Sequence, residues 1–264
     1  MKSPVTSTAP EELRRMIRRG ELVRPTSGMA PGYVQANLAI LPKEQAFDFL
    51  LFCQRNPKPC PLIEVVDSGM TQPRYTASDA DLRSDISKYR CYVYGELEFE
   101  SEDLLGHWRE DLVSFLIGCS FTFESALIRS GIPLRHIEQH TNVSMFTTNI
   151  QTVPAGIFSG PMVVSMRPIQ RAKVAKAVQV TSRFPGMHGA PVHVGNPSEI
   201  GIQDVKKPDI GDPVEIKDDE VPVFWACGVT PQSVAMASKP PFMITHAPGH
   251  MFITDIRDEE FSLL

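Results

Sequence analysis

The sequence predicts an α/β protein with a largely parallel sheet flanked by helices in three layers and a smaller two-layer α+β lobe inserted into it. Segments of apolar strand character alternate with segments of helical pattern, which favours strand–helix units and a parallel sheet. Proline (23) and glycine (17) punctuate the whole chain and keep these elements short. The length of 264 residues suits one main domain with a smaller second one.

The elements follow in order along the chain. Helices are expected at 10–19, 42–55, 122–130, 168–178 and 230–237. Strands are expected at 62–66, 89–94, 113–119, 143–148, 162–166, 221–227 and 242–246. Pro10 suits a helix start, and the second helix must stop at Asn56-Pro57-Lys58-Pro59. LIEVV at 62–66 has the β-branched run of a buried strand. The main domain is then 1–136 with 187–264, and the inserted lobe is 137–186.

Charge and cysteine content exclude several classes of protein. A net charge of −5 argues against nucleic-acid binding, and no apolar run reaches the length of a membrane span. The first twenty residues lack the apolar centre of a secretory signal, so a cytoplasmic protein is expected. Four arginines there should form the solvated face of an amphipathic helix: Arg14, Arg15, Arg18 and Arg19. Five cysteines without a CxxC pair argue against a disulfide framework and against structural zinc.

Two segments of the chain echo each other. FLIGCSFTFESALIRSGIP, from Phe115, aligns without gaps with VFWACGVTPQSVAMASKPP, from Val223, 108 residues later. The aligned pairs include Cys119 with Cys227, Thr122 with Thr230, and Glu124 with Gln232. The echo suggests an internal pseudo-repeat; the alternative is that strand–helix units resemble one another by chance.

Each copy predicts an anion site beside a thiol. The threonines should cap the two helices, and a strand that turns directly into a helix leaves unpaired N–H groups there. Such a turn can hold a carboxylate and lower the pKa of a thiol. We therefore expect Cys119 and Cys227 at the carboxyl ends of two strands of one sheet. Otherwise both are small buried hydrophobic residues.

Histidines and arginines supply further candidates. The loops TSRFPGMHGAPVHVG (181–195) and THAPGHMFITD (245–255) carry His188, His193, His246 and His250, which could act as general acid or base. Arg167, at the end of a strand, and Arg183 could clamp a carboxylate, although ordinary salt bridges are the alternative. His136 and His140 have helical spacing but no HExxH pattern, so no metal site is expected. No GxGxxG, Walker or GxSxG motif occurs.

Several long blocks resemble the D-glutamate cyclase family, including its bacterial hydro-lyase group. They are GYVQANLAILP, FLLFCQRNPKPCPLIEV, FLIGCSFTFESAL, MVVSMRP, TSRFPGMHGAPVHVG, FWACGVTPQ and THAPGHMFITD. The resemblance covers nearly all of the chain after about residue 25. It implies loss of water from a small carboxylate, as in closure of D-glutamate to 5-oxo-D-proline, without a cofactor.

The residues then divide into two predicted groups. Those expected to be catalytic are Cys119, Cys227, His188, His193, His246 and Glu124. Those expected to bind substrate are Ser120, Thr122, Arg167, Arg183, Thr230 and Gln232. The alternatives are a two-thiol racemase for a small acidic substrate and a non-catalytic protein that binds a small acid. The expected partner is a small carboxylate, and assembly into a homo-oligomer is left open.

Overall fold

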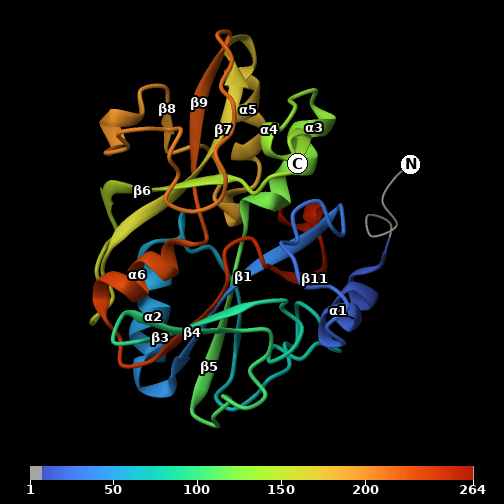
Figure 1. Ribbon diagram of the computed structural model, residues 1–264, viewed down its shortest axis with the longest axis vertical. Helices are drawn as coiled ribbons and strands as arrows, with labels where there is room; N and C mark the ends of the chain where they lie inside the picture. The colour runs from blue at the N-terminus through green and yellow to red at the C-terminus, as the bar shows by residue number, and fades with distance from the viewer. Residues whose placement is uncertain (1–7, 264) are drawn as a thin grey trace.

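The computed structural model describes residues 8–263 (Figure 1). The helices are α1 (Pro10–Arg18), α2 (Lys43–Arg55), α3 (Glu124–Arg129), α4 (Arg135–Glu138), α5 (Val174–Ser182) and α6 (Thr230–Ser238). Short 3₁₀ turns are η2 (Ser120–Phe123), η3 (Arg171–Lys173), η4 (Pro185–Met187), η5 (Pro197–Ile200) and η6 (Asp258–Phe261). The strands are β1 (Tyr33–Pro42), β2 (Leu62–Val66), β3 (Tyr89–Val93), β4 (Glu96–Ser101), β5 (Leu112–Ile117), β6 (Ser144–Gln151), β7 (Pro161–Gln170), β8 (His193–Val194), β9 (Glu220–Ala226), β10 (Met243–His246) and β11 (Phe252–Arg257).

The prediction of a largely parallel, three-layer sheet is wrong. The described strands form two sheets, one in the order β2-β5-β1-β10-β3-β4 with β11 also paired to β1, the other β6-β7-β9-β8. Every pairing in them is antiparallel. The physical reason lies in the connections. After β5 the chain passes through η2, α3 and α4 into the other sheet, so the strand–helix pattern closes no parallel crossover.

Strand β1 organises the larger sheet and has no counterpart among the predicted strands. It pairs with β5, β10 and β11, and Asn37 lies opposite Ile117 at the end of β5. All but one of the residues of β1 are buried, which explains why its sequence, YVQANLAILP, is mostly apolar. Phe49 and Phe52 of α2 pack on one face of this sheet together with Phe115. The other face has its own core around Leu116 and Ile244.

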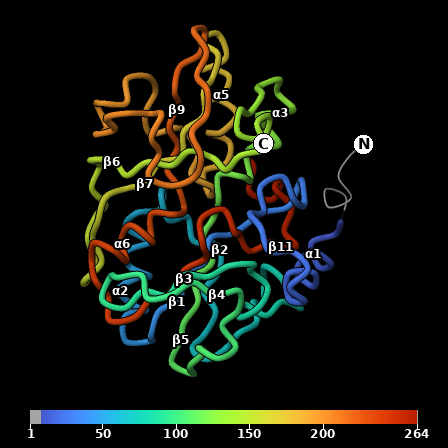
Figure 2. The backbone as a smooth tube through the Cα atoms, viewed as in Figure 1, coloured from blue at the N-terminus to red at the C-terminus, as the bar shows by residue number. Residues whose placement is uncertain are grey.

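The smaller sheet extends further along β7 than predicted. Strand β7 continues through Pro168 to Gln170, and the expected helix at 168–178 begins later, as η3 and α5. Pro168 of β7 is paired with Pro222 of β9. Neither proline has an N–H group, so both missing donors fall at the same pair of residues in the sheet. Arg167 therefore lies within β7 and not at its end. All four described strands of this sheet lie between residues 144 and 226 (Figure 2). The division of the chain into a main domain and an inserted lobe stays a prediction.

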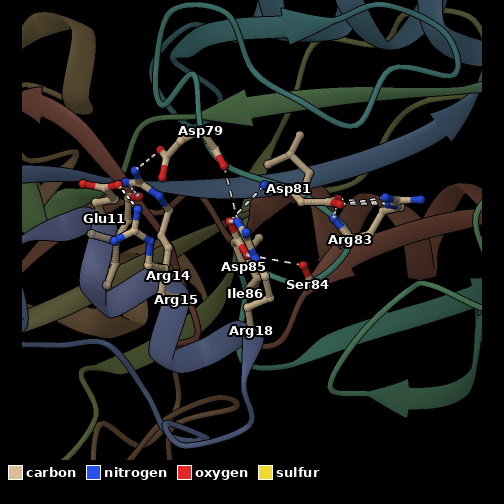
Figure 3. Close-up of polar contacts among 12 residues, drawn as sticks. Glu11, Arg14, Arg15, Arg18, Asp79, Asp81, Arg83, Ser84, Asp85 and Ile86 are labelled. Carbon is tan, nitrogen blue, oxygen red and sulfur yellow. Dashed lines mark hydrogen bonds and ion pairs between the residues drawn. The ribbon is translucent and has the colours of Figure 1, made fainter.

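Helix α1 is attached by its arginines, which corrects the expectation of a solvated basic face. Arg14 is fully buried and forms ion pairs with Asp79 and, at 2.9 Å, with Asp255 of β11. Arg18 forms an ion pair with the buried Asp85 at 2.6 Å (Figure 3). Arg15 and Arg19 are about half exposed, as expected for a solvated face.

Among the described helices, none has the length and apolar character that crossing a bilayer requires. The expectation about a secretory signal partly concerns residues 1–7, which lie outside the described residues.

Candidate functional site

A buried ion pair between Glu124 and Arg167 lies where the two sheets meet. Glu124 begins α3, directly after the turn that follows β5, and Arg167 comes from the middle of β7. The guanidinium Nε and Nη2 atoms donate to Glu124 Oε1 at 3.1 and 2.5 Å. Arg167 is fully buried and Glu124 is 5% exposed. In this structure Arg167 therefore binds a carboxylate of the protein, that of Glu124, whereas the sequence suggested that it binds a carboxylate of the substrate.

Hydroxyl groups complete the surroundings of Arg167. Nη2 also donates to Ser120 Oγ at 3.0 Å, and Nη1 donates to Ser165 Oγ at 3.0 Å. The guanidinium lies over the rings of Phe123 and Trp225, at 5.5 and 5.6 Å from their centroids. Each guanidinium nitrogen of Arg167 therefore has a hydrogen-bond partner, and the bonds to Glu124 fix the orientation of its carboxylate.

His136 is a member of this cluster that sequence reasoning did not assign to it. Its Nε2 lies 3.1 Å from Glu124 Oε1, a close contact that lacks the alignment of a hydrogen bond. Burial alone would raise the pKa of Glu124, but the neighbouring His136 and Arg167 reverse this and hold that pKa below its ordinary value. Glu124 is therefore ionised throughout the neutral range. In the sequence, His136 lies four residues before His140, a spacing that suggests one face of a helix. This spacing gives no signal for a contact between His136 and Glu124.

Glu124 also lines a pocket of about 320 Å³. The lining includes the loop 28–33, Ser125 and Ile128 of α3, and Asp258, the first residue after β11. This volume suits a small molecule. The pocket thus has a fixed negative charge in a mostly apolar lining.

The two cysteine turns lie in contact, although they follow strands of different sheets. Cys119 comes after β5 and Cys227 after β9, each just before a helical segment, as predicted; the expectation that they share one sheet is wrong. A Cβ atom on Gly228 would lie 2.8 Å from Gly118 O and 1.9 Å from Asn37 Nδ2, so the turns pack main chain to main chain. Only glycine allows this approach.

Neither thiol has the environment that the sequence suggested. Burial raises the pKa of Cys119 well above its ordinary value, and burial raises the pKa of Cys227 to about 11. Both thiols are therefore neutral near pH 7. Neither residue lines the pocket beside Glu124. The catalytic role of the cysteines stays a prediction, and their burial works against it.

The threonines do not cap their helices. Thr122 lies inside η2, where the Phe121 N–H donates to Cys119 Sγ at 3.5 Å, and Thr122 Oγ1 has no hydrogen-bond partner in the described chain. Thr230 Oγ1 donates to Cys227 O at 2.7 Å and accepts from Val163 N at 3.2 Å. It therefore ties α6 to β7. The helix start is also fully buried, which leaves the predicted anion site there without an opening.

His188 and His246 are buried beside main-chain groups. Nδ1 of His188 lies 2.7 Å from Lys58 O and Nε2 lies 3.0 Å from Gly118 O, so the ring joins two loops. His246 Nδ1 lies 3.2 Å from Leu38 N, and its carbonyl accepts from Gln232 Nε2 at 2.6 Å. Burial lowers the pKa of each histidine to about 4, so both rings are neutral at pH 7.

Two predicted residues lie apart from this cluster. His193 belongs to β8, where Nε2 lies 2.7 Å from Asn196 O. Arg183 is exposed and donates from Nε to Leu263 O at 3.0 Å. The structure thus joins Ser120, Glu124 and Arg167 in one network and leaves these two outside it.

Comparison with known proteins gives a consistent result. The family model described as D-glutamate cyclase matches residues 113–255. A "Putative hydro-lyase" of Thermoanaerobacter sp. is 64% identical over 250 residues, covering 95% of this chain and 94% of that protein. One from Bacillus licheniformis is 60% identical over 260 residues (98% and 99%), and "Putative hydro-lyase YcsI" of Bacillus subtilis is 59% identical over 256 residues (97% and 100%).

Among solved structures, a nitrogen repressor-like protein from Methanococcus jannaschii aligns with 92% of this chain and 97% of its own. The TM-score is 0.38 at 11% identity, a likeness too weak to support an argument.

Proposed function

The chain belongs to the D-glutamate cyclase family, and from this premise we propose that it is a hydro-lyase acting on a small amino dicarboxylic acid. The lead reaction is closure of D-glutamate to 5-oxo-D-proline with loss of water. The relatives named above support the reaction class. The residues of the pocket support the type of substrate.

One observation carries the proposal: Glu124 presents an ionised carboxylate to a small pocket. Cyclisation requires that the substrate's ammonium group be bound and that it lose protons before it attacks the distal carboxyl group. A carboxylate held in one orientation by Arg167 can form a charge-assisted hydrogen bond with that ammonium and accept its proton. A hydroxy acid brings no positive charge, so the pocket favours an amino acid.

The two-thiol racemase is the weaker alternative. Proton abstraction by a cysteine needs a thiolate, and the pKa of each thiol is raised by burial. It also needs both thiols to line one pocket, and the pocket beside Glu124 contains neither of them. No specific contact favours this function over the dehydration.

Product analysis by NMR tests the proposal. Purified protein is incubated with D- and L-glutamate, aspartate, malate and 2-hydroxyglutarate in separate tubes. We expect a dehydrated or cyclised product from an amino diacid, with D-glutamate first among them. Glu124→Gln should lower this rate by about 10²–10⁴-fold, since it removes the charge and keeps the shape.

The matched control is Glu138→Gln, which changes a half-exposed carboxylate on α4 and should retain the wild-type rate. Thermal unfolding of each variant confirms that it is folded. Absence of product from every substrate with wild-type protein would refute the proposed function. A racemised substrate would support the thiol alternative instead.

A further inference from the structure

Asp258 is a second carboxyl group that lines the same pocket as Glu124. It is the first residue of η6, directly after β11, and its N–H donates to Gly32 O at 3.0 Å. This bond joins it to the loop 28–33, which also lines the pocket. The residue is only 2% exposed. The fold therefore places two buried carboxyl groups, from α3 and from the end of β11, at one small cavity.

The Asp258 side chain lacks the partner that a buried carboxylate needs. Within residues 8–263, its Oδ1 atom is buried and has no hydrogen-bond partner. A charged carboxylate in that position is costly, whereas a protonated one is not. Asp258 lines the cavity, so a molecule bound there can supply the partner that the described chain does not.

Charged groups from three elements surround Asp258. Glu259 lies next to it on η6, Arg129 on α3 and Arg257 on β11, and Glu124 lies beyond them on α3. Burial is the largest influence and, with the two glutamates, outweighs the two arginines, so the pKa of Asp258 rises to about 7. Arg129 is further occupied by Glu259, at 3.9 Å.

We propose that Asp258 is the proton donor to the departing oxygen, and that the cavity between Asp258 and Glu124 binds an amino dicarboxylic acid. This inference rests on the proposed function and deepens it. The substrate's ammonium group contacts Glu124, and its distal carboxylate contacts Asp258. Two carboxyl groups side by side cannot both ionise readily, so the bound substrate keeps Asp258 protonated.

The proton transfers balance over one cycle. Glu124 takes a proton from the ammonium, and the freed nitrogen lone pair forms the new bond to the distal carboxyl carbon. Asp258 gives its proton to one carboxyl oxygen. As the carbon–oxygen bond breaks with its electron pair on oxygen, that oxygen takes the second proton from Glu124 and leaves as water. The nitrogen returns a second proton to Asp258. The product is a lactam, and both carboxyl groups end as they began.

The division of labour follows from the surroundings of each group. Glu124 is held ionised by Arg167 and His136, which suits the binding of a cation. Asp258 has no such partner and stays near half protonation at neutral pH, which suits a proton donor. Paired carboxyl groups with pKa values driven apart by their environments are typical of acid–base sites.

An NMR titration tests the pocket without relying on turnover. The full-length protein is labelled with ¹³C at aspartate carboxyl carbons, and spectra are recorded from about pH 5 to about pH 9, with and without unlabelled D-aspartate, which carries both an ammonium group and a distal carboxylate. We expect one resonance with a midpoint near pH 7 that is missing in Asp258→Asn, and D-aspartate should raise that midpoint. If no such resonance titrates above about pH 6, or if D-aspartate leaves its midpoint unchanged, the inference is overturned.

Kinetics separate this inference from the proposed function. On the substrate that wild-type protein uses, Asp258→Asn should lose about 10²–10⁴-fold in turnover and also lose the decline in rate above pH 7. Asp258→Glu should restore part of both, and Glu138→Gln on α4 should retain the wild-type rate. If Asp258→Asn keeps the wild-type rate and pH profile, Asp258 is not the donor, while the dehydration itself stands. If the wild-type protein forms no product, the proposed function fails and the titration still decides what the pocket binds.

Discussion

Replacement of Asp258 by asparagine should stabilise the protein, and the gain should grow with pH. Burial and the nearby Glu259 raise the pKa of Asp258 from its ordinary 3.8 to about 7. In the unfolded chain the carboxyl group ionises near pH 4, whereas in the folded protein it holds its proton up to about pH 7. A raised carboxyl pKa therefore costs no stability below the unfolded value and costs progressively more up to the folded value. Asparagine has no proton to lose and avoids this cost.

The structure sets the size of the effect. Each pKa unit is worth about 1.4 kcal/mol, so the full cost approaches about 4 kcal/mol above pH 7. Between pH 5 and pH 8 the advantage of Asp258→Asn should grow by about 3 kcal/mol. For a chain of this length, about 1 kcal/mol corresponds to about 2 °C in Tm. Relaxation around the charge reduces the value, so a growth of about 2–6 °C in the Tm difference is expected.

Differential scanning calorimetry of both proteins at pH 5 and pH 8 measures this difference. Glu138→Gln is the control, because that carboxylate lies on α4, is 52% exposed and is not among the charged groups around Asp258. Its effect should be much smaller at both pH values. A Tm difference for Asp258→Asn that is the same at pH 5 and pH 8 would show that Asp258 ionises normally in the folded protein. Asp258 would then hold no proton near pH 7 and could not be the donor.

Two further predictions concern the cysteines and helix α1. Cys119→Ala and Cys227→Ala should each keep the catalytic rate within about tenfold of wild type. Iodoacetamide should modify both thiols slowly at pH 7, because they are buried and neutral. A loss of about 10²-fold or more in the rate of either variant would support the thiol mechanism instead. Arg14→Ala should lower the free energy of unfolding, measured by urea titration, by about 2–3 kcal/mol. The control Arg15→Ala, on the same helix, should change it by less than about 0.5 kcal/mol. Equal effects of the two substitutions would show that the buried ion pairs of Arg14 do not anchor α1.

Local sequence signals were sufficient for several elements. Helices α1, α2 and α6 lie within a residue of their predicted bounds, because prolines mark where they start or where they must stop. The sheet topology could not be obtained in the same way. A strand followed by a helix is compatible with a parallel crossover or with passage into another sheet, and only long-range pairing decides between them.

The candidate site was partly visible in the sequence. Ser120, Glu124 and Arg167 were predicted and form one network, since each lies beside a strand end or within a strand that the pattern identified. His136 and Asp258 were missed. Asp258 begins the run DEEF, which resembles a solvated turn, and its burial depends on the loop 28–33 from the other end of the chain. No local pattern reports such a contact.

The most direct test of the account follows an oxygen atom. D-Glutamate labelled with ¹⁸O at both oxygens of its distal carboxyl group is incubated with the wild-type protein. The mass of the product, and with it the number of ¹⁸O atoms retained, is measured by mass spectrometry. Dehydration at the Glu124–Asp258 pocket predicts 5-oxo-D-proline that retains one labelled oxygen, with the other released as water. Recovery of glutamate with both labels, whether unchanged or converted to the L-form, would contradict the central claim.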